Sequence, residues 1–291
     1  MKIGCLIYFY GRKYEKLGSC AMESFKKFHP DITLFHVNKN NREAHGLTAV
    51  PDTGASKYML AYEIMIKHKL DKIIILGADT ITCARLNEFL DDNEHDILAS
   101  LDYPYYLVDN HMLLTPTEET HLNADVICFN NLKAIRDIIK KSPLFPAYAE
   151  QGALNYVVWS NDYKYSCKIV DGPYLKSKVV YNVRSKGNMC LPKGYHAQPL
   201  DGPGKPAKFS TYEKPWGPHL NKFYVQDKKL YTKDHKQIKV WHYCDGFGNL
   251  SEENFVKLMN NYIFKWFSED AKKYFTEHCA CGDFFEKEFT L

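Results

Sequence analysis

The stretch that decides the fold is a short apolar run that ends in a turn, Lys72-Ile73-Ile74-Ile75-Leu76-Gly77-Ala78-Asp79-Thr80. Its first five residues are almost wholly apolar, as expected for a strand in a mostly parallel sheet that helices cover on both faces. In open α/β sheets, ligands bind beyond the carboxyl ends of such strands. The stretch therefore predicts a central strand over residues 72–76 and a functional site at residues 77–80.

The segments around this strand alternate between strand and helix patterns. Strand patterns cover residues 3–9, 32–37, 96–101 and 124–129, and helix patterns cover residues 14–28, 56–69, 132–140 and 151–158. This alternation predicts an α/β fold with a mostly parallel central sheet. Asn130-Asn131 is expected to cap the helix that follows it. Short strands are expected again at residues 223–225, 229–231 and 238–243.

The chain is expected to form one large domain with a C-terminal extension. Residues 1–250 carry the Rossmann-like alternation, and within them residues 184–218 are rich in Gly and Pro with few apolar runs. Such a composition predicts a long loop or lid over the site. Residues 251–291 begin with an amphipathic helix pattern, so a helical extension packed on the same domain is expected.

Composition excludes several classes of function. The net charge of +3 is too mild for a surface that follows nucleic-acid phosphates. The apolar run at the N-terminus is too short and interrupted for a signal peptide or a membrane anchor. Nine scattered Cys residues fit reduced thiols, and the close pair in Cys279-Ala280-Cys281 lacks a second pair to complete a metal site. We therefore expect a cytoplasmic protein with no nucleic-acid partner and no transmembrane segment.

Two residues are candidate metal ligands. Asp79 ends a buried strand, where a carboxylate can hold Mg²⁺ or Mn²⁺ between two phosphates; the alternative is that it caps a helix over residues 84–90. His242 ends the last expected strand and could supply a nitrogen ligand, while the turn at Gly246 could offer backbone donors to a diphosphate. The alternative for His242 is a histidine of the core between two aromatic residues.

Other polar residues are expected to line the same cleft. Glu150 and Gln151 start a helix with an acid and an amide directed at the carboxyl edge of the sheet, and Asn123-Ala124-Asp125 precedes a strand. Lys57 and Arg85 are candidate partners for phosphate or ribose, although a solvated lysine on the surface is the common alternative.

Taken in order, these segments resemble the motifs of GT-A glycosyltransferases, in particular the family 8 group that includes glycogenin and the bacterial lipopolysaccharide galactosyltransferases. Leu76-Gly77-Ala78-Asp79-Thr80 is similar to the Leu-Asp-Ala-Asp-Thr metal motif of that family, and Asn123-Ala124-Asp125-Val126 to its Asn-Ala-Gly-Val segment. Glu150-Gln151-Gly152-Ala153-Leu154-Asn155 is similar to Asp-Gln-Asp-x-Leu-Asn, Tyr181-Asn182 to a Tyr-Asn pair, and His242-Tyr243 with Gly246 to His-Tyr-x-Gly. Five weak motifs in the right order over residues 1–250 are more specific than any one of them.

The resemblance implies a hexosyl- or pentosyltransferase that moves a sugar from a nucleotide diphosphate sugar, such as a UDP-sugar, to a hydroxyl of a glycan or other acceptor. It implies retention of configuration, Mn²⁺ or Mg²⁺ bound by Asp79 and His242, and Glu150 and Gln151 near the anomeric carbon. The remaining substrate contacts that it implies are Tyr8 or Tyr10 against the base, Gly246 near the diphosphate, and Asn123, Asp125 and Lys57 on the donor sugar or acceptor. Ala78 is a further expected substrate contact.

Three positions depart from the family pattern. Gly77 replaces the first Asp of the metal motif, so a donor phosphate, water or another carboxylate such as Asp102 would have to complete the metal site. Asp125 replaces a Gly and would be the general base of an inverting mechanism. Gly152 replaces the second Asp of its motif. Two alternatives remain. One is a sugar-nucleotide-binding module without turnover. The other is a metal-dependent nucleotidyltransferase, but Tyr10-Gly11-Arg12-Lys13 is only weakly similar to the Gly-rich loop of that class.

Overall fold

The structure is a computed structural model of the chain. The described residues are 1–8, 12–38, 40–48, 56–78, 80–101, 122–145, 149–171, 179–181, 183–184, 223–227, 229–232 and 235–242.

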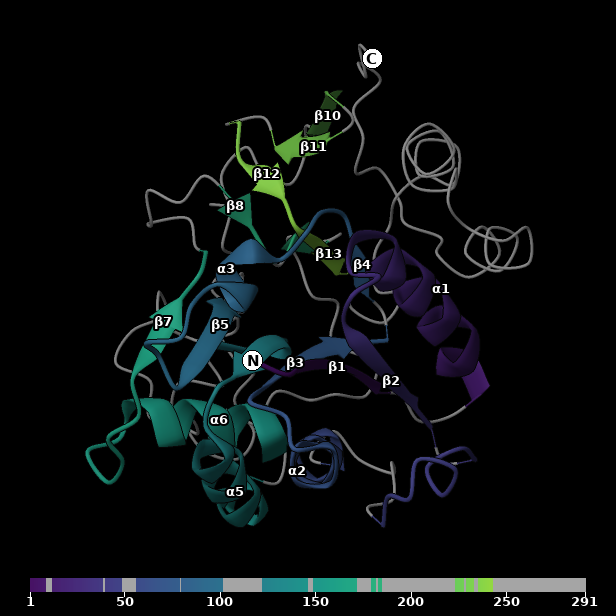
Figure 1. Cartoon of the computed structure of the whole chain (residues 1–291). Coiled ribbons are helices and arrows are strands. Elements are labelled where there is room, and N and C mark those ends of the chain that lie inside the picture. The colour runs from purple at the N-terminus through teal and green to yellow at the C-terminus, as the bar shows by residue number, and fades with distance from the viewer. Residues whose placement is uncertain are drawn as a thin grey trace, which may run out of the picture.

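A six-stranded sheet forms the centre of the molecule (Figure 1). Its strands are ordered β2 (Thr33–Val37), β1 (Ile3–Tyr8), β3 (Lys72–Gly77), β6 (Leu122–Phe129), β5 (Ile97–Leu101) and β7 (Cys167–Ile169). Neighbouring strands are parallel except at β6, which runs antiparallel to both β3 and β5. The expected α/β fold, with a mostly parallel sheet and the strand from Lys72 at its centre, is confirmed.

Helices cover both faces of this sheet (Figure 1). One face packs against α2 (Ser56–His68), α5 (Leu132–Lys141) and α6 (Ala149–Trp159), and the other against α1 (Arg12–Phe28) and the short α3 (Asn87–Leu90). Successive side chains of a strand point to opposite faces. Ile73 and Ile75 accordingly join the core under α2, whereas Ile74 and Leu76 join the core under α1, and all four are fully buried. The apolar run in β3 is thus explained by burial on both sides.

Two smaller sheets lie beyond the central one. A three-stranded sheet pairs β4 (Thr80–Thr82) with β13 (Val240–His242) and β13 with β9 (Val183–Arg184). A four-stranded sheet contains β10 (Phe223–Gln226), β11 (Lys229–Thr232), β12 (Gln237–Ile238) and β8 (Val179–Val180). The sheet with β4 matters for function, because β4 starts where the turn after β3 ends.

Most of the expected elements are found within a few residues of the expected ends. Asn131 caps α5 as expected, accepting a hydrogen bond from the backbone of Lys133 at 2.9 Å. A 3₁₀ turn, η2 (Ser142–Leu144), follows that helix. The strands β4, β7, β8 and β9, each of two or three residues, were not expected.

Two expectations need correction. The helix expected over residues 84–90 begins only at Asn87, because Thr80–Thr82 pairs with β13 as a strand. The single strand expected over residues 238–243 is split at Lys239 between two sheets, and its ammonium group donates to the carbonyl of Arg85 at 2.9 Å.

Among the described helices, none is long and apolar enough to cross a membrane. The expected lid, apart from Arg184, and the expected extension over residues 251–291 lie outside the described residues.

Candidate functional site

The reversed strand β6 brings polar residues to the edge where β3 ends. Val126 of β6 lies beside Leu76 of β3, so the residues that start β6 lie just beyond the carboxyl end of β3. Asn123 and Asp125 both lie inside β6, which begins two residues before the strand that the sequence suggested over residues 124–129. Their position at this edge agrees with the expectation that they line a common cleft.

Side-chain amides of α6 fix the start of β6. The carbonyl oxygen of Asn155 accepts a hydrogen bond from the backbone of Leu122 at 2.8 Å, and its amide nitrogen donates to the carbonyl of the same residue at 3.1 Å. The carbonyl oxygen of Gln151 accepts from the backbone of Ala124 at 3.2 Å. Gln151 was expected near the anomeric carbon; here its oxygen binds the strand, and this holds the first turn of α6 against β6.

Lys57 joins three elements at this edge. From the first turn of α2, its ammonium group hydrogen bonds Asp125 of β6 and lies 3.5 Å from a carboxylate oxygen of Glu150 of α6. The Lys57 side chain is only 3% exposed, whereas those of Asp125 and Glu150 are 35% and 21% exposed. Burial by itself would lower the pKa of Lys57, but the two carboxylates outweigh it and raise the pKa above its ordinary value. Lys57 is thus a buried cation and not a solvated one.

Tyr58 adds a buried hydroxyl beside this cluster. The residue is fully buried, and its ring packs edge-on against Phe129 at 5.7 Å between centroids. Among the described residues, its hydroxyl oxygen has no hydrogen-bond partner. Burial, and then the charges of Glu150 and Asp125, raise the pKa of Tyr58 well above its ordinary value, so the hydroxyl keeps its proton.

The turn after β3 is tied to the strand that carries His242. The hydroxyl of Thr80 donates to the carbonyl of Gly77 at 2.7 Å, which closes the turn around position 79. β4 pairs with β13 so that His242 lies opposite Thr80, and β9 places Arg184 opposite His242 on the other side. His242 is 2% exposed. A buried imidazole is thus held across from the residue that follows Asp79.

The described residues test the expected metal site only in part. Asp79, together with Tyr10, Asp102 and Gly246, lies outside the described residues. Among the residues that the structure does describe, no three His, Cys, Asp or Glu side chains are grouped so that they could hold a metal ion. An imidazole next to a carboxylate is nevertheless a donor pair that suits a divalent cation. Asp79 and His242 would therefore suit a divalent cation, and of the two only His242 is among the described residues.

The structure also shows the surroundings of three other candidate site residues. Tyr8 ends β1 opposite Gly77 and is only 7% exposed, so its ring belongs to the core. Ala78 is buried in the turn. Arg85, considered as a phosphate partner, instead donates twice to the carboxylate of Asp31, at 2.7 Å each.

The tyrosine of the Tyr181-Asn182 motif is a buried residue. Its hydroxyl donates to Glu88, its backbone nitrogen donates to the carboxylate of Asp171, and its ring packs against Phe89 at 4.6 Å between centroids. Burial, followed by the charge of Glu88, raises the pKa of Tyr181 well above its ordinary value. Tyr181 therefore fastens the segment before β9 to α3, while Asn182 lies outside the described residues.

Sequence reasoning missed the burial of Lys57, although a signal was present. Lys57 shares the spacing of Leu60, Ala61 and Ile64, the positions one face of a helix presents to the core. All three of these apolar residues are fully buried, and Lys57 is buried with them. The pattern would have placed Lys57 on the inner face of α2.

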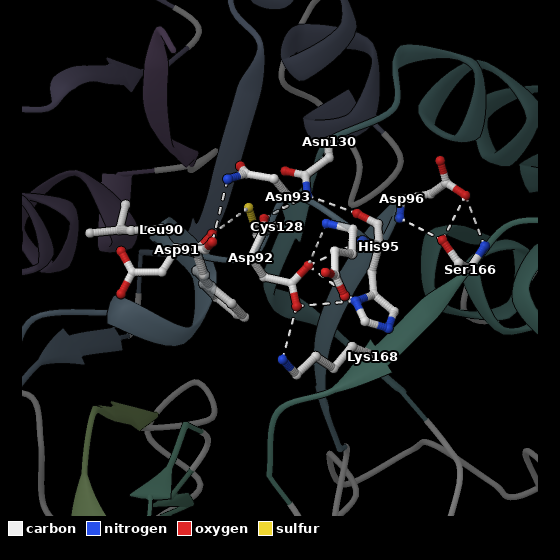
Figure 2. A network of polar contacts seen from close by, with 12 residues as sticks. Leu90, Asp91, Asp92, Asn93, His95, Asp96, Cys128, Asn130, Ser166 and Lys168 are labelled. Atoms are coloured by element: carbon white, nitrogen blue, oxygen red, sulfur yellow. Dashed lines mark hydrogen bonds and ion pairs between the residues drawn. The ribbon is translucent and has the colours of Figure 1, made fainter.

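The opposite edge of the sheet carries a second polar network (Figure 2). Asp92 accepts from the ammonium group of Lys168 at 2.8 Å and contacts the imidazole of His95 at 3.0 Å, and Asp96 accepts from Ser166. At the start of β3, the buried ammonium group of Lys72 donates to the carbonyls of Phe89, Leu90 and Asp92 at 2.7, 3.0 and 2.7 Å. These charged groups bind one another and the backbone.

No protein-family model matches the chain, and no curated protein matches its sequence. Among solved structures, the bifunctional glycosyltransferase WbbM in its apo form is similar over 91% of this chain and 50% of its own, with 14% identity and a TM-score of 0.47. The chain thus spans half the length of WbbM. The galactosyltransferase LgtC, in complex with donor and acceptor sugar analogs, is similar over 94% of this chain and 100% of its own, with 15% identity and a TM-score of 0.44.

A third similar structure is a glycosyltransferase involved in the glycosylation of the major capsid of PBCV-1, over 63% of this chain and 85% of its own, with 11% identity and a TM-score of 0.41. All three structures are glycosyltransferases. At these TM-scores and identities, the likenesses by themselves assign no activity to the chain.

Proposed function

We propose that this protein is a glycosyltransferase that moves a sugar from a nucleotide diphosphate sugar, such as a UDP-sugar, to an acceptor hydroxyl. The observation that carries the proposal is the meeting of Lys57, Asp125 and Glu150 from α2, β6 and α6 at the carboxyl edge of β3. This edge is where ligands bind in open α/β sheets. The five motifs that follow the family order along the sequence support the same proposal.

The two carboxylates suit the chemistry of sugar transfer. As the bond between the anomeric carbon and the diphosphate breaks, positive charge develops on the sugar ring, and a fixed carboxylate stabilises that charge. Glu150 is the residue that we assign to this role. The acceptor oxygen then bonds to the anomeric carbon and gives its proton to the oxygen of the departing diphosphate, and the nucleoside diphosphate leaves.

Retention of configuration follows the family pattern and is the outcome that we propose. An inverting reaction would need a base on the acceptor side of the sugar, and Asp125 would be that base. Because the side chains of Asp125 and Glu150 are 35% and 21% exposed beside Lys57, both can accept hydrogen bonds from sugar hydroxyls.

We further propose that Asp79 and His242 hold Mn²⁺ or Mg²⁺. The register of β13 against β4, with His242 opposite Thr80, supports this proposal. When bound, the cation neutralises charge on the leaving diphosphate. Asp79→Asn and His242→Ala should each weaken Mn²⁺ binding measured by calorimetry and abolish metal-stimulated turnover while the protein stays folded. Full activity of Asp79→Asn would make this assignment wrong.

The proposed activity is tested by incubating the protein with a panel of nucleotide sugars, with and without Mn²⁺, and following nucleoside diphosphate release. Asp125→Asn and Glu150→Gln should each lower turnover by about 10²-fold or more, a typical loss for a positioned acid or base. Asp96→Asn, at the opposite edge of the sheet, is the matched control and should keep wild-type turnover.

A second candidate is a sugar-nucleotide-binding module without turnover, which Gly77 favours because it removes a carboxylate from the metal motif. Binding of a nucleoside diphosphate, seen as a thermal shift, without release from any sugar donor would support this module. Release of pyrophosphate from a nucleoside triphosphate would instead indicate a nucleotidyltransferase.

A further inference from the structure

The feature from which the inference starts is the burial of Lys57 between two more exposed acids. Its side chain is 3% exposed, and its ammonium group contacts both Asp125 and Glu150. These acids come from different elements, β6 and α6, and α2 supplies the lysine, so a single cation ties three segments together. The acids, not the lysine, reach the surface at this edge.

In this geometry the ammonium group of Lys57 is engaged by the protein and is not open to a ligand. A lysine that binds a phosphate must present its ammonium group to the ligand, and a nucleophilic lysine must lose its proton. The ammonium group of Lys57 faces two protein carboxylates, and these carboxylates raise its pKa against the opposing effect of burial. Lys57 stays protonated and acts through Asp125 and Glu150.

We propose that Lys57 is a positioning residue that holds Asp125 and Glu150 side by side as two ionised carboxylates. The inference rests on the proposed glycosyltransferase function, because it assigns these carboxylates to the sugar. It concerns in particular Asp125, which stands where the family pattern has a Gly and which therefore adds a second acid to the cleft. The positive charge of Lys57 compensates the negative charge that this second acid adds.

The charges around the cluster explain why a cation is needed. Two carboxylates that share a site without a cation repel each other, and one of them takes up a proton. A protonated acid would no longer stabilise positive charge on a sugar ring. The described groups around the ammonium group are Asp125, Glu150 and the ring of Tyr58, whose centroid lies 5.9 Å away, so Lys57 is the only cation among them.

The experiment compares Lys57→Met with Lys57→Arg and with Lys72→Met, a variant of another buried lysine, at the opposite edge. Infrared difference spectra recorded through an acid titration should show the protonated carboxyl band at a pH about one unit or more higher in Lys57→Met than in the wild type, Lys57→Arg or Lys72→Met. This measurement needs no substrate. A band that appears at the wild-type pH in a folded Lys57→Met would overturn the inference.

Kinetics on an active donor give the second measurement. Lys57→Met should lower kcat by about 100-fold, with a smaller effect on KM, because a small displacement of a reacting group can cost that much. The acid limb of its pH–rate profile should move to higher pH by about one unit or more, as expected when a counter-charge is removed. Lys57→Arg should keep the wild-type limb, since guanidinium keeps the charge. An unmoved limb in Lys57→Met would contradict the inference.

A third measurement covers the case in which Lys57→Met does not fold. In Asp125→Asn, the NMR titration of the Lys57 side chain should move to lower pH than in the wild type, because one of its two carboxylates is gone. An unchanged titration would overturn the inference. If the wild type turns over no nucleotide sugar while the infrared band and this titration behave as expected, the proposed function fails and the coupling of Lys57 to the acids stands.

Discussion

Lys57 and Lys72 are both almost excluded from water, yet they are held in opposite ways at opposite edges of one sheet. Lys72, 1% exposed, donates to three backbone carbonyls, and its partners carry no full charge. Burial is the main influence on Lys72 and lowers its pKa. Lys57 contacts two carboxylates, and its pKa is raised.

The difference separates a structural site from the candidate functional site. Around Lys72, the acceptors belong to the backbone, and nearby Asp92, whose side chain is 7% exposed, binds Lys168 and His95 (Figure 2). Around Lys57, the acids remain 35% and 21% exposed. Each carboxylate can accept several hydrogen bonds, and the cation occupies only some of them. Because these acids are partly exposed, their remaining lone pairs can accept hydrogen bonds from a ligand. The candidate site thus differs from the other edge in what its acids can still bind.

The largest effect is expected from removing both acids that hold Lys57. Asp125→Ala with Glu150→Ala would leave a buried ammonium group without a counter-ion, at a cost of about 3–5 kcal/mol in the free energy of unfolding. Adding Lys57→Met should recover much of that loss, because an apolar residue of similar size replaces the stranded charge. Urea denaturation of the double and triple variants measures both steps. A triple variant no more stable than the double variant would show that the stranded charge is not the cause.

A smaller loss is expected from Lys72→Met. The change leaves buried carbonyl oxygens without their donor, which costs about 2–3 kcal/mol. Nucleoside diphosphate release should be unaffected once stability is allowed for. Urea denaturation and the donor assay are run side by side; lost turnover in a folded Lys72→Met would mean that the two edges are coupled.

The contributions of the two edges to stability should be lost at opposite ends of the pH scale. Burial opposes ionisation of Asp92, but hydrogen bonds from Lys168 and His95 outweigh it and lower the pKa of this carboxyl. The stability that Asp92 contributes is present above about pH 4 and is lost as the pH falls below that value. The contribution of Lys57, whose pKa is raised, is present below about pH 10.4 and is lost as the pH rises further.

Asp92→Asn should flatten the acid limb of the free energy of unfolding, and Lys57→Met the alkaline limb, in urea titrations across pH. If Asp92→Asn leaves the acid limb as steep as in the wild type, another carboxyl controls it.

The smallest effect is expected from Arg85→Met. The pair of Arg85 and Asp31 is exposed, at 43% and 57%, so its loss should cost about 0.2–1 kcal/mol. KM for the nucleotide sugar should be unchanged, because the guanidinium group is engaged with Asp31. A marked rise in KM would restore the role of phosphate partner that the sequence suggested.

The sequence predicted the parts of the fold that depend on local pattern. The apolar run at residues 72–76 identified the central strand, which the structure extends to Gly77, and the spacing of apolar residues identified the longer helices. The strands β4 and β9 were missed, because strands of two or three residues are defined by their partners and carry little pattern of their own. The β-branched run Thr80–Thr82 was the one available sign of β4.

The candidate site was predicted as a set of positions but not as a set of contacts. The motifs identified Asp125, Glu150 and His242, and β6 brings the first of these to the expected edge. The helical spacing of Lys57 indicates the inner face of α2, but its place between the two acids depends on the approach of α2, α6 and β6, which no local pattern records. Lysine is almost never fully buried unless it is paired, so its residue type alone suggested the surface.

The reversal of β6 also bears on how the chain folds. Asp125 reaches Lys57 across 68 positions of sequence, and Asn155 reaches Leu122 across 33, so the edge is closed by distant contacts. Contacts of such long range are slow to form. The binding edge therefore exists only in the completed protein. A ligand that occupies it binds the folded chain alone and, at a concentration of 100 times its dissociation constant, would raise the free energy of unfolding by about 2.7 kcal/mol.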